Sequence, residues 1–280
     1  MDLLRISDLK REQIEEIYKY AAEFKNGGKS NVLKNKNVVT IFPQSSLRTR
    51  LTFETAVNDL SGRISSFDID TLEKSEALED VVSYLNNWVD LMIIRYPDIT
   101  KIEEIQKYAS FPIINAMTRE NHPCEILSDY FGLGELIGSI ADLTYSFVGS
   151  SGNILNSWIH IANIFSLDLQ QIFPKKYETK NRSIKTTDQV SEIKNSDIIL
   201  SDPFPEEFSE NNPYTITKEL VQSIAKKVYI NPCPPFRRNV DITDEVLQSK
   251  SFVGYEFKKN LVYVQKGIIE YCMKNSIDRK

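Results

Sequence analysis

Short apolar runs alternate with helical patterns along almost the whole chain, and this alternation restricts the possible folds more than any other feature. A β-branched or apolar run of about four to seven residues between polar turns is typical of a buried strand. Strands separated by helices form parallel sheets, because each crossover helix returns the chain to the same edge. The expected strands are residues 37–42, 63–67, 89–95, 112–115, 143–149, 197–201 and 227–230. The expected helices are residues 50–60, 75–88, 102–108, 122–137, 153–165, 217–225 and 260–274.

The pattern divides into two halves near residues 134–141, and 280 residues are enough for two domains of ordinary size. We therefore predict an α/β protein of two domains, each a parallel sheet flanked by helices. The first domain covers residues 1–135 and the second covers residues 136–259. The terminal helix, within residues 260–280, is expected to pack back on the first domain.

Charge and cysteine content exclude several classes of function. A net charge of −5 and the lack of a long basic tract argue against nucleic-acid or membrane-surface partners. No apolar run approaches the roughly 20 residues of a membrane span, and residues 1–13 lack the apolar segment of a secretory signal. The three cysteines are scattered, and no cysteine and histidine cluster has metal-ligand spacing. We expect a cytoplasmic protein that needs neither a metal nor an organic cofactor.

Polar turns follow most of the expected strands. In parallel sheets, binding sites lie at the carboxyl ends of the strands, so these turns hold the candidate functional residues. They are residues 43–50, 95–98, 115–122, 149–153, 202–206 and 231–238.

The first of these turns carries hydroxyl and guanidinium groups at the start of a helix. Ser45, Ser46, Arg48, Thr49 and Arg50 lie within six positions. Cations are unfavourable at the positive end of a helix dipole unless an anion is also bound there. Backbone N–H groups, hydroxyls and guanidinium groups together form a phosphate site. The alternative is a surface helix cap with solvated arginines.

The segment Ser46-Leu47-Arg48-Thr49-Arg50 resembles the S-x-R-T-R signature of the aspartate/ornithine carbamoyltransferase family. The resemblance covers most of the chain, and its segments occur in the family's order. The other similar segments are Lys74–Ala77 with Asp80, Arg95, Asn115–Thr118, His122–Cys124, Gly149–Ser157, Pro232–Pro235, Arg237–Val240 and Thr243–Val246.

The resemblance implies a site for carbamoyl phosphate in the first domain. Three residues, Thr49, Arg95 and His122, would be catalytic by directing donors at the carbonyl oxygen, which gains charge as an amine attacks. The residues implied to bind carbamoyl phosphate are Ser46, Leu47, Arg48, Thr49, Arg50, Lys74, Arg95, His122 and Glu125. The departing phosphate is a plausible acceptor for the proton of the amine.

The resemblance also implies an amino-acid site in the second domain. The acceptor would contact Asn153, Asp202, Cys233, Pro234 and Arg237. In the ornithine enzymes, the aspartate matching Asp202 pairs with the α-ammonium group of the amino acid. The family forms homotrimers with shared sites, in which the loop matching Lys74 enters a neighbouring subunit. Its N-acylornithine branch is knotted, so a knotted chain is an expectation from this resemblance.

Each of these residues also has a purely structural interpretation. His122 without the resemblance, and His160 in any case, would be packed helix residues. Arg95 could form a salt bridge at a sheet rim, and Lys74 could be a surface lysine. Cys233 could be a small buried apolar residue. For Asp202, the alternative is a turn residue before a proline.

Several positions depart from the family's pattern and leave the acceptor open. Glu125 stands where the family has Gln, and a carboxylate there should weaken binding of a dianion unless it is protonated or paired. Residues 203–207 replace the S-M-G loop, and the further departures are Ser150, Pro232, Met117 and Leu261. The acceptor is ornithine or an N-acylornithine, which would place the protein in arginine biosynthesis. The alternatives are another amine such as aspartate, or a non-catalytic role in binding an anion or a partner.

Overall fold

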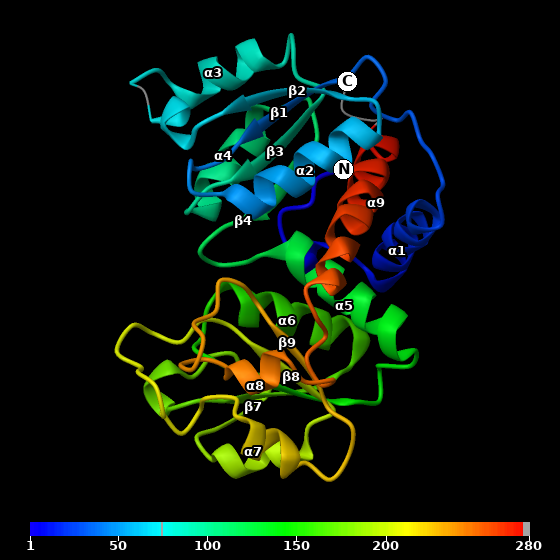
Figure 1. Cartoon of the computed structure of the whole chain (residues 1–280). Helices are drawn as coiled ribbons and strands as arrows, with labels where there is room; N and C mark the ends of the chain where they lie inside the picture. Colours follow the sequence, from blue (N-terminus) through cyan, green and yellow to red (C-terminus); the bar gives the residue numbers. More distant parts are fainter. Residues whose placement is uncertain (74, 277–280) are drawn as a thin grey trace. The chain divides into compact units, whose positions relative to one another are not determined.

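The computed structural model describes residues 1–73 and 75–276, and the chain forms two compact units (Figure 1). Unit 1 consists of Met1–Gly132 together with the chain from Lys259 onward, and unit 2 is Leu133–Lys258. Each unit is built on a parallel sheet flanked by helices, which confirms the predicted α/β fold class. A knotted path stays a prediction.

The sheet of unit 1 has the strand order β2-β1-β3-β4. Its strands are β1 (Asn37–Ile41), β2 (Arg63–Phe67), β3 (Leu91–Arg95) and β4 (Ile113–Met117). The connecting helices are α2 (Leu47–Asp59), α3 (Leu78–Leu85) and α4 (Ile99–Tyr108). From β1 the chain goes to β2 on one side and then returns to β3 on the other. The carboxyl ends of β1 and β3 therefore form a topological switch point, where ligands bind in such sheets.

The central strands of unit 1 are buried on both faces. Val38 and Val39 of β1, and Met92 and Ile93 of β3, are almost completely shielded from solvent. Helices cover both faces of a parallel sheet, so its inner strands are continuous apolar runs. This burial explains why β1 and β3 were readily predicted, and it holds the turns after them on a rigid support.

Two helices that are far apart in sequence pack together in unit 1. They are α1 (Arg11–Lys25) and α9 (Asn260–Lys274), which lie side by side in Figure 1. A Cβ on Gly267 would lie 2.6 Å from the carbonyl oxygen of Ile17, so only glycine permits this close crossing. From α9, Gln265 Nε2 also donates to Thr52 Oγ1 of α2 at 3.0 Å.

The sheet of unit 2 has the strand order β7-β6-β5-β8-β9. Its strands are β5 (Thr144–Val148), β6 (Asp168–Ile172), β7 (Lys185–Thr187), β8 (Ile198–Ser201) and β9 (Tyr229–Pro232). Its helices include α6 (Asn153–Phe165), α7 (Lys218–Gln222) and α8 (Asp244–Leu247), and α5 (Pro123–Ile137) precedes β5. The switch point of this sheet lies between β5 and β8.

The predicted helices 153–165 and 260–274 and the strand 63–67 have the predicted bounds. By contrast, α2 begins earlier than predicted, at Leu47, and α3 is shorter than the predicted 75–88. Four elements, α1, β6, β7 and α8, were not expected from the sequence pattern. Two glutamines interrupt the apolar run of β6, and β7 is a short polar strand at the sheet edge. Among the described residues, no helix combines the length and apolar character needed to cross a membrane.

Candidate active site

Three candidate turns of unit 1 follow neighbouring strands. Residues 43–50 follow β1, Arg95 ends β3, and residues 118–122 follow β4. Because β3 lies between β1 and β4, these turns meet at one edge of the sheet. The predicted residues in these three turns are therefore brought to one edge by strand order, although they are spread over about 80 positions in the sequence.

Arg95 joins two of these turns. The register with β4 shifts between Ile94 and Arg95, and such an irregularity redirects a side chain. Its Nη1 atom donates to Ser46 Oγ at 3.2 Å and to Thr49 Oγ1 at 3.3 Å. Burial lowers the pKa of Arg95, and the positive charge of Arg48 lowers it further. Arginine still remains protonated at neutral pH, so a cation without a carboxylate partner among the described residues lies at the start of α2.

The first turn of α2 lacks the groups that usually neutralise a helix N-terminus. It contains no acidic residue, and the Ser46 side chain forms no capping hydrogen bond. Arg48 is exposed, while Arg50 is half-buried and donates from Nη2 to the Phe42 carbonyl at 3.3 Å. Within the described residues, no carboxylate forms an ion pair with Arg48, Arg50 or Arg95. The turn therefore has the positive charge and the donors that a dianion requires.

Leu47 differs from its neighbours in this turn, because its side chain is 76% exposed. Any contribution of Leu47 to an anion site would come from its backbone. Lys74, which the sequence analysis also assigned to carbamoyl phosphate, lies outside the described residues.

His122 and Glu125 lie where β4 leads into α5. Thr118 Oγ1 accepts hydrogen bonds from the backbone N–H groups of Glu120 and Asn121, both at 3.1 Å, and fixes this turn. His122 directly precedes α5, and Glu125 is in its first turn. Both side chains are 8% exposed. Two buried ionisable side chains thus lie where the chain passes from β4 into α5, and β4 is next to the strand that carries Arg95.

In unit 2, the turns after β5 and β8 approach each other closely. A Cβ on Gly149 would lie 3.0 Å from a ring atom of Phe147 and 3.4 Å from the backbone nitrogen of Asp202. Gln171 Nε2 donates to the Gly149 carbonyl at 2.8 Å and supports the turn. Asn153 begins α6 immediately after it. The structure therefore places Asn153 and Asp202 on either side of the β5/β8 switch point.

The carboxyl group of Asp202 in unit 2 is strongly perturbed. Burial, and secondarily the charge of Asp241, raise its pKa from 3.8 to about 7. Its carboxylate has no hydrogen-bond or ion-pair partner among the described residues, whereas Asp241 is paired with Arg237. A buried carboxylate beside a second one binds cations, because a cation offsets both the desolvation and the repulsion.

Cys233 and Pro234 lie past the end of β9. The backbone N–H of Cys233 donates to the Ser201 carbonyl at 2.8 Å, so the pairing of β9 with β8 continues through this residue. Cys233 is 7% exposed, and the Pro234–Pro235 peptide bond is cis. Cys233 therefore lies beside Asp202 at the carboxyl edge of the sheet.

The arginines after β9 hold protein groups. Arg237 Nη2 donates to the carbonyls of Phe204 at 2.9 Å and Pro205 at 3.2 Å, and Nη1 donates to that of Phe208 at 3.3 Å. Arg238 pairs with Asp244. The predicted contact of Arg237 with an acceptor stays a prediction, and the contacts that the structure shows are with the segment after Asp202.

Sequence reasoning missed Gln171 and Asp241. Neither belongs to a quoted motif, although a glutamine in an apolar strand and an aspartate four residues after an arginine are signals of buried hydrogen bonding. No group of three or more His, Cys, Asp or Glu side chains within the described residues is arranged to hold a metal ion.

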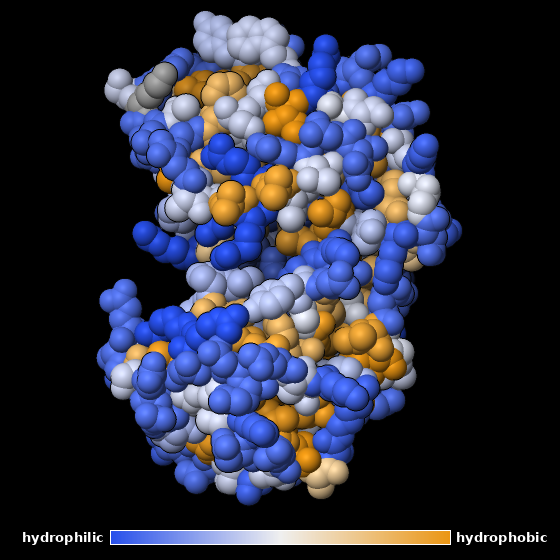
Figure 2. Space-filling view, viewed as in Figure 1, coloured by the Kyte–Doolittle hydropathy of each residue, from blue (hydrophilic) through white to orange (hydrophobic). Residues whose placement is uncertain are grey.

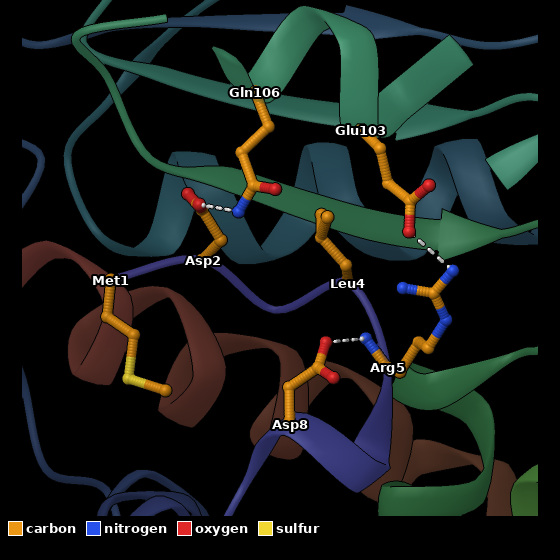
Figure 3. Close-up of a pocket in the computed structure, with 7 residues that line it drawn as sticks. All are labelled: Met1, Asp2, Leu4, Arg5, Asp8, Glu103 and Gln106. Atoms are coloured by element: carbon orange, nitrogen blue, oxygen red, sulfur yellow. Dashed lines mark hydrogen bonds and ion pairs between the residues drawn. The ribbon is translucent and has the colours of Figure 1, made fainter. Parts of the chain in front are cut away.

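A pocket of about 410 Å³ lies elsewhere in unit 1 (Figure 3). Its polar groups are largely paired with one another: Arg5 with Glu103 at 2.6 Å, and Gln106 with Asp2. It contains none of the predicted site residues. The lining residues are Met1, Asp2, Leu4, Arg5, Asp8, Glu103 and Gln106.

Unit 1 thus has arginines without a carboxylate partner among the described residues at the carboxyl edge of its sheet, and unit 2 has a buried carboxyl group at its switch point. Residues 1–135 match the carbamoyl-phosphate-binding domain model of the aspartate/ornithine carbamoyltransferases, and residues 141–272 match the Asp/Orn-binding domain model. The chain belongs to the aspartate/ornithine carbamoyltransferase family, whose members are transferases.

Ornithine carbamoyltransferases are similar to this chain over nearly their whole length. The protein from Methanococcus aeolicus is 30% identical over 302 residues, which cover 97% of this chain and 99% of the relative. The solved structure of the Pyrococcus furiosus enzyme has a TM-score of 0.89 at 26% identity and covers 98% of this chain and 97% of its own. The Burkholderia thailandensis enzyme has a TM-score of 0.89 at 25% identity, with coverage of 97% and 98%.

Proposed function

We propose that this protein transfers the carbamoyl group of carbamoyl phosphate to the side-chain amine of ornithine, giving citrulline and phosphate. The observation that carries the choice of acceptor is the buried carboxylate of Asp202, which has no cationic partner among the described residues. The names of the similar proteins support the same acceptor. On this proposal the protein acts in the cytoplasm, in arginine biosynthesis.

Each unit would bind one substrate. Residues 1–135 together with residues 260–280 form the carbamoyl-phosphate-binding domain, and residues 136–259 form the amino-acid-binding domain. Ser46, Arg48, Thr49 and Arg50 hold the phosphate at the start of α2. The unneutralised charge of this turn supports the assignment.

The reaction places charge on the carbonyl oxygen of carbamoyl phosphate. The amine nitrogen forms a bond to the carbonyl carbon, the bond from that carbon to the bridging oxygen breaks, and phosphate leaves. Arg95, Thr49 and His122 donate to the oxygen as it becomes negative. An alkyl ammonium group has a pKa of about 10.4, so it must first release one proton to solvent to become a nucleophile, and the attacking nitrogen then gives a second proton to the departing phosphate. This chemistry needs no metal and no organic cofactor.

A free α-ammonium group distinguishes ornithine from its N-acyl derivatives. N-acylation removes that cation, and Asp202 would then remain buried beside Asp241 without compensation. The arginines that could bind an acyl carboxylate, Arg237 and Arg238, are already paired with Asp241 and Asp244. An aspartate acceptor would add an anionic side chain to a unit 2 site whose candidate arginines are engaged. Both observations favour free ornithine.

The test is an acceptor panel with purified protein and saturating carbamoyl phosphate. Ornithine, N-acetylornithine, N-succinylornithine and aspartate are compared by formation of the ureido product. We expect turnover with ornithine at least about a hundredfold above the others, as loss of a buried charge pair implies. Preference for an N-acyl derivative would reject the role given to Asp202. Binding of carbamoyl phosphate without turnover of any of the four would indicate a different acceptor, and folded protein that does not bind carbamoyl phosphate would indicate the non-catalytic role.

The variant Glu125→Gln should bind carbamoyl phosphate roughly tenfold more tightly, because one negative charge near a dianion is removed. Glu125 is buried in the first turn of α5, so solvent screens it little. Affinity is measured by calorimetry in the absence of acceptor. Glu104→Gln, an exposed site on α4, is the matched control. Equal or weaker binding by Glu125→Gln would place Glu125 in a different network.

We also propose a homotrimer with shared sites, on the evidence of an exposed apolar stripe on α2. Leu47 and Leu51 are one turn apart and 76% and 61% exposed; Leu47 lies within the anion-site turn and Leu51 directly follows it. Figure 2 shows apolar side chains on the surface over α2. Such a stripe is typical of an interface.

The variant Leu51→Glu should therefore convert trimers to smaller species and reduce activity at least about tenfold, because a charge is costly in a buried apolar interface. Sedimentation equilibrium measures the mass. Tyr255→Glu replaces a similarly exposed residue of unit 2, 64% exposed, and should leave the mass unchanged. A wild-type monomer, or a trimeric Leu51→Glu variant, would contradict this interface.

A further inference from the structure

One polar side chain in the sheet of unit 2 is buried and has no hydrogen-bond partner among the described residues. Asn231, on β9, is 3% exposed. Neither its Nδ2 nor its Oδ1 atom forms a hydrogen bond with any described residue. Burial of an amide without hydrogen bonds is unfavourable, and buried polar groups are almost always paired. The other strand residues around it, Ile230 and Leu200, are apolar, so an apolar side chain would suit the sheet better.

The strand register places Asn231 on the same face as the candidate acceptor residues. Asn231 pairs with Leu200 of β8, so their side chains share a face. Two residues further along each strand stand Cys233 and Asp202, and the Cys233 N–H bond to Ser201 shows that the pairing continues. By alternation, Asn231, Cys233 and Asp202 lie on one face. The opposite face carries Ile230, which belongs to an apolar cluster.

The depth of Asn231 follows from the same register. Cys233 and Asp202 lie at the carboxyl edge of the sheet, and Asn231 lies two residues below that edge on β9. Two strand residues span about 6.6 Å. A group bound between Asp202 and Cys233 is therefore within about the length of an amino-acid head group of the Asn231 amide.

We propose that Asn231 binds the α-amino-acid group of the acceptor, and this inference rests on the proposed function. An amide offers both a donor and an acceptor. Its Nδ2 donates to the α-carboxylate, and its Oδ1 accepts from the α-ammonium group that Asp202 neutralises. Because an amide is uncharged, it adds nothing to the repulsion between Asp202 and Asp241. Asn231 would thus favour acceptors that carry an α-amino-acid group over other amines.

The test separates ligand binding from structure with Asn231→Leu, which has nearly the same shape but no polar atom. We expect ornithine binding to weaken by a factor of about 10 to 100, as loss of hydrogen bonds to charged groups implies. Carbamoyl phosphate affinity should not change. The midpoint of thermal unfolding should stay the same or rise, because an unpaired amide is removed.

A control and a second variant keep the test decisive. Thr243→Val also removes a buried polar atom that has no partner among the described residues. Thr243 is next to Ile242, which belongs to the same apolar cluster as Ile230, on the other face of the sheet from Asn231. The Thr243→Val variant should leave ornithine binding unchanged. Asn231→Ser, which is smaller, replaces Asn231→Leu if the leucine variant does not fold, and it should weaken ornithine binding as well.

Two results would overturn the inference, and they are distinguishable. Wild-type protein that binds ornithine, with equal binding by the Asn231 variants, removes the role of Asn231 and leaves the proposed function intact. Wild-type protein that does not bind ornithine removes the proposed function and this inference together. A lower unfolding midpoint of Asn231→Leu with unchanged ornithine binding would assign Asn231 a structural role.

Discussion

Arg95→Ala should lower kcat/KM for carbamoyl phosphate by about a thousandfold, the upper range for loss of one donor to a developing oxyanion. Arg95 is held by Ser46 and Thr49 at the start of α2 and has no carboxylate partner among the described residues. Its positive charge is therefore available to a substrate. Steady-state phosphate release measures the loss.

If Arg95 had only a structural role, the Arg95→Ala variant would be destabilised and would keep a normal kcat/KM. Burial and Arg48 lower the pKa of Arg95, which shows that the fold disfavours this charge. If Arg95 instead serves the anion site, the Arg95→Ala variant should unfold at the same temperature as the wild type or higher. Arg63→Ala removes an exposed arginine at the opposite, amino-terminal edge of the same sheet and should keep full activity. A destabilised Arg95→Ala variant with normal kcat/KM would reject the anion site.

Asp202→Asn should weaken binding of α-amino acids by about a hundredfold, the cost of losing one partner of a buried charge pair. The probe is norvaline, which has the α-ammonium and α-carboxylate groups of ornithine but no side-chain amine. The affinity for norvaline therefore does not depend on the protonation state of a side-chain amine. Calorimetry between pH 5.5 and 8.5 measures it.

The pH dependence follows from the pKa of Asp202, which is about 7. Below that pH the carboxyl group is mostly protonated, and the ammonium must displace a proton to bind. Wild-type affinity for norvaline should fall about tenfold per pH unit below 7 and be constant above it. Asp202→Asn should show no such change, because an amide does not titrate. A flat wild-type profile would contradict this account.

The free energy of unfolding should change with pH in the direction opposite to the affinity for norvaline. The pKa of Asp202 is higher in the folded chain, about 7, than its ordinary value of 3.8. The folded chain therefore loses stability as pH rises from about 4 to 7. Asp202→Asn removes that loss and should increase the free energy of unfolding at pH 8 by up to about 4 kcal/mol, with no gain at pH 3.5. Urea unfolding at the two pH values measures the difference.

The role of the 45–50 turn could be predicted because its hydroxyl and guanidinium groups are adjacent in the sequence. Arg48 and Arg50 next to Ser46 at a helix start are anomalous within a few positions, and the structure shows that no described acid neutralises them. The parallel sheets were predictable for a similar reason, since buried strands such as β1 and β3 are continuous apolar runs.

The rest depends on contacts between distant positions. The three carbonyls that Arg237 holds, from Phe204 to Phe208, lie about 30 residues before it, and nothing in its local motif indicates them. Gln171 supports Gly149 across neighbouring strands. Asn231 is in an apolar run and is unusual only because the fold buries it. Strand pairing places Gln171 beside Gly149 and buries Asn231, whereas the partners of Arg237 depend on the path of the loop after β8, and a local sequence pattern shows none of these arrangements.

The most direct measurement is product analysis with carbon-13-labelled carbamoyl phosphate and ornithine, followed by NMR. The account predicts that wild-type protein forms labelled citrulline and phosphate in equal amounts, and that Arg95→Ala forms almost none. Phosphate release without citrulline, or no turnover by folded protein that binds both substrates, would contradict the proposal that this chain is an ornithine carbamoyltransferase.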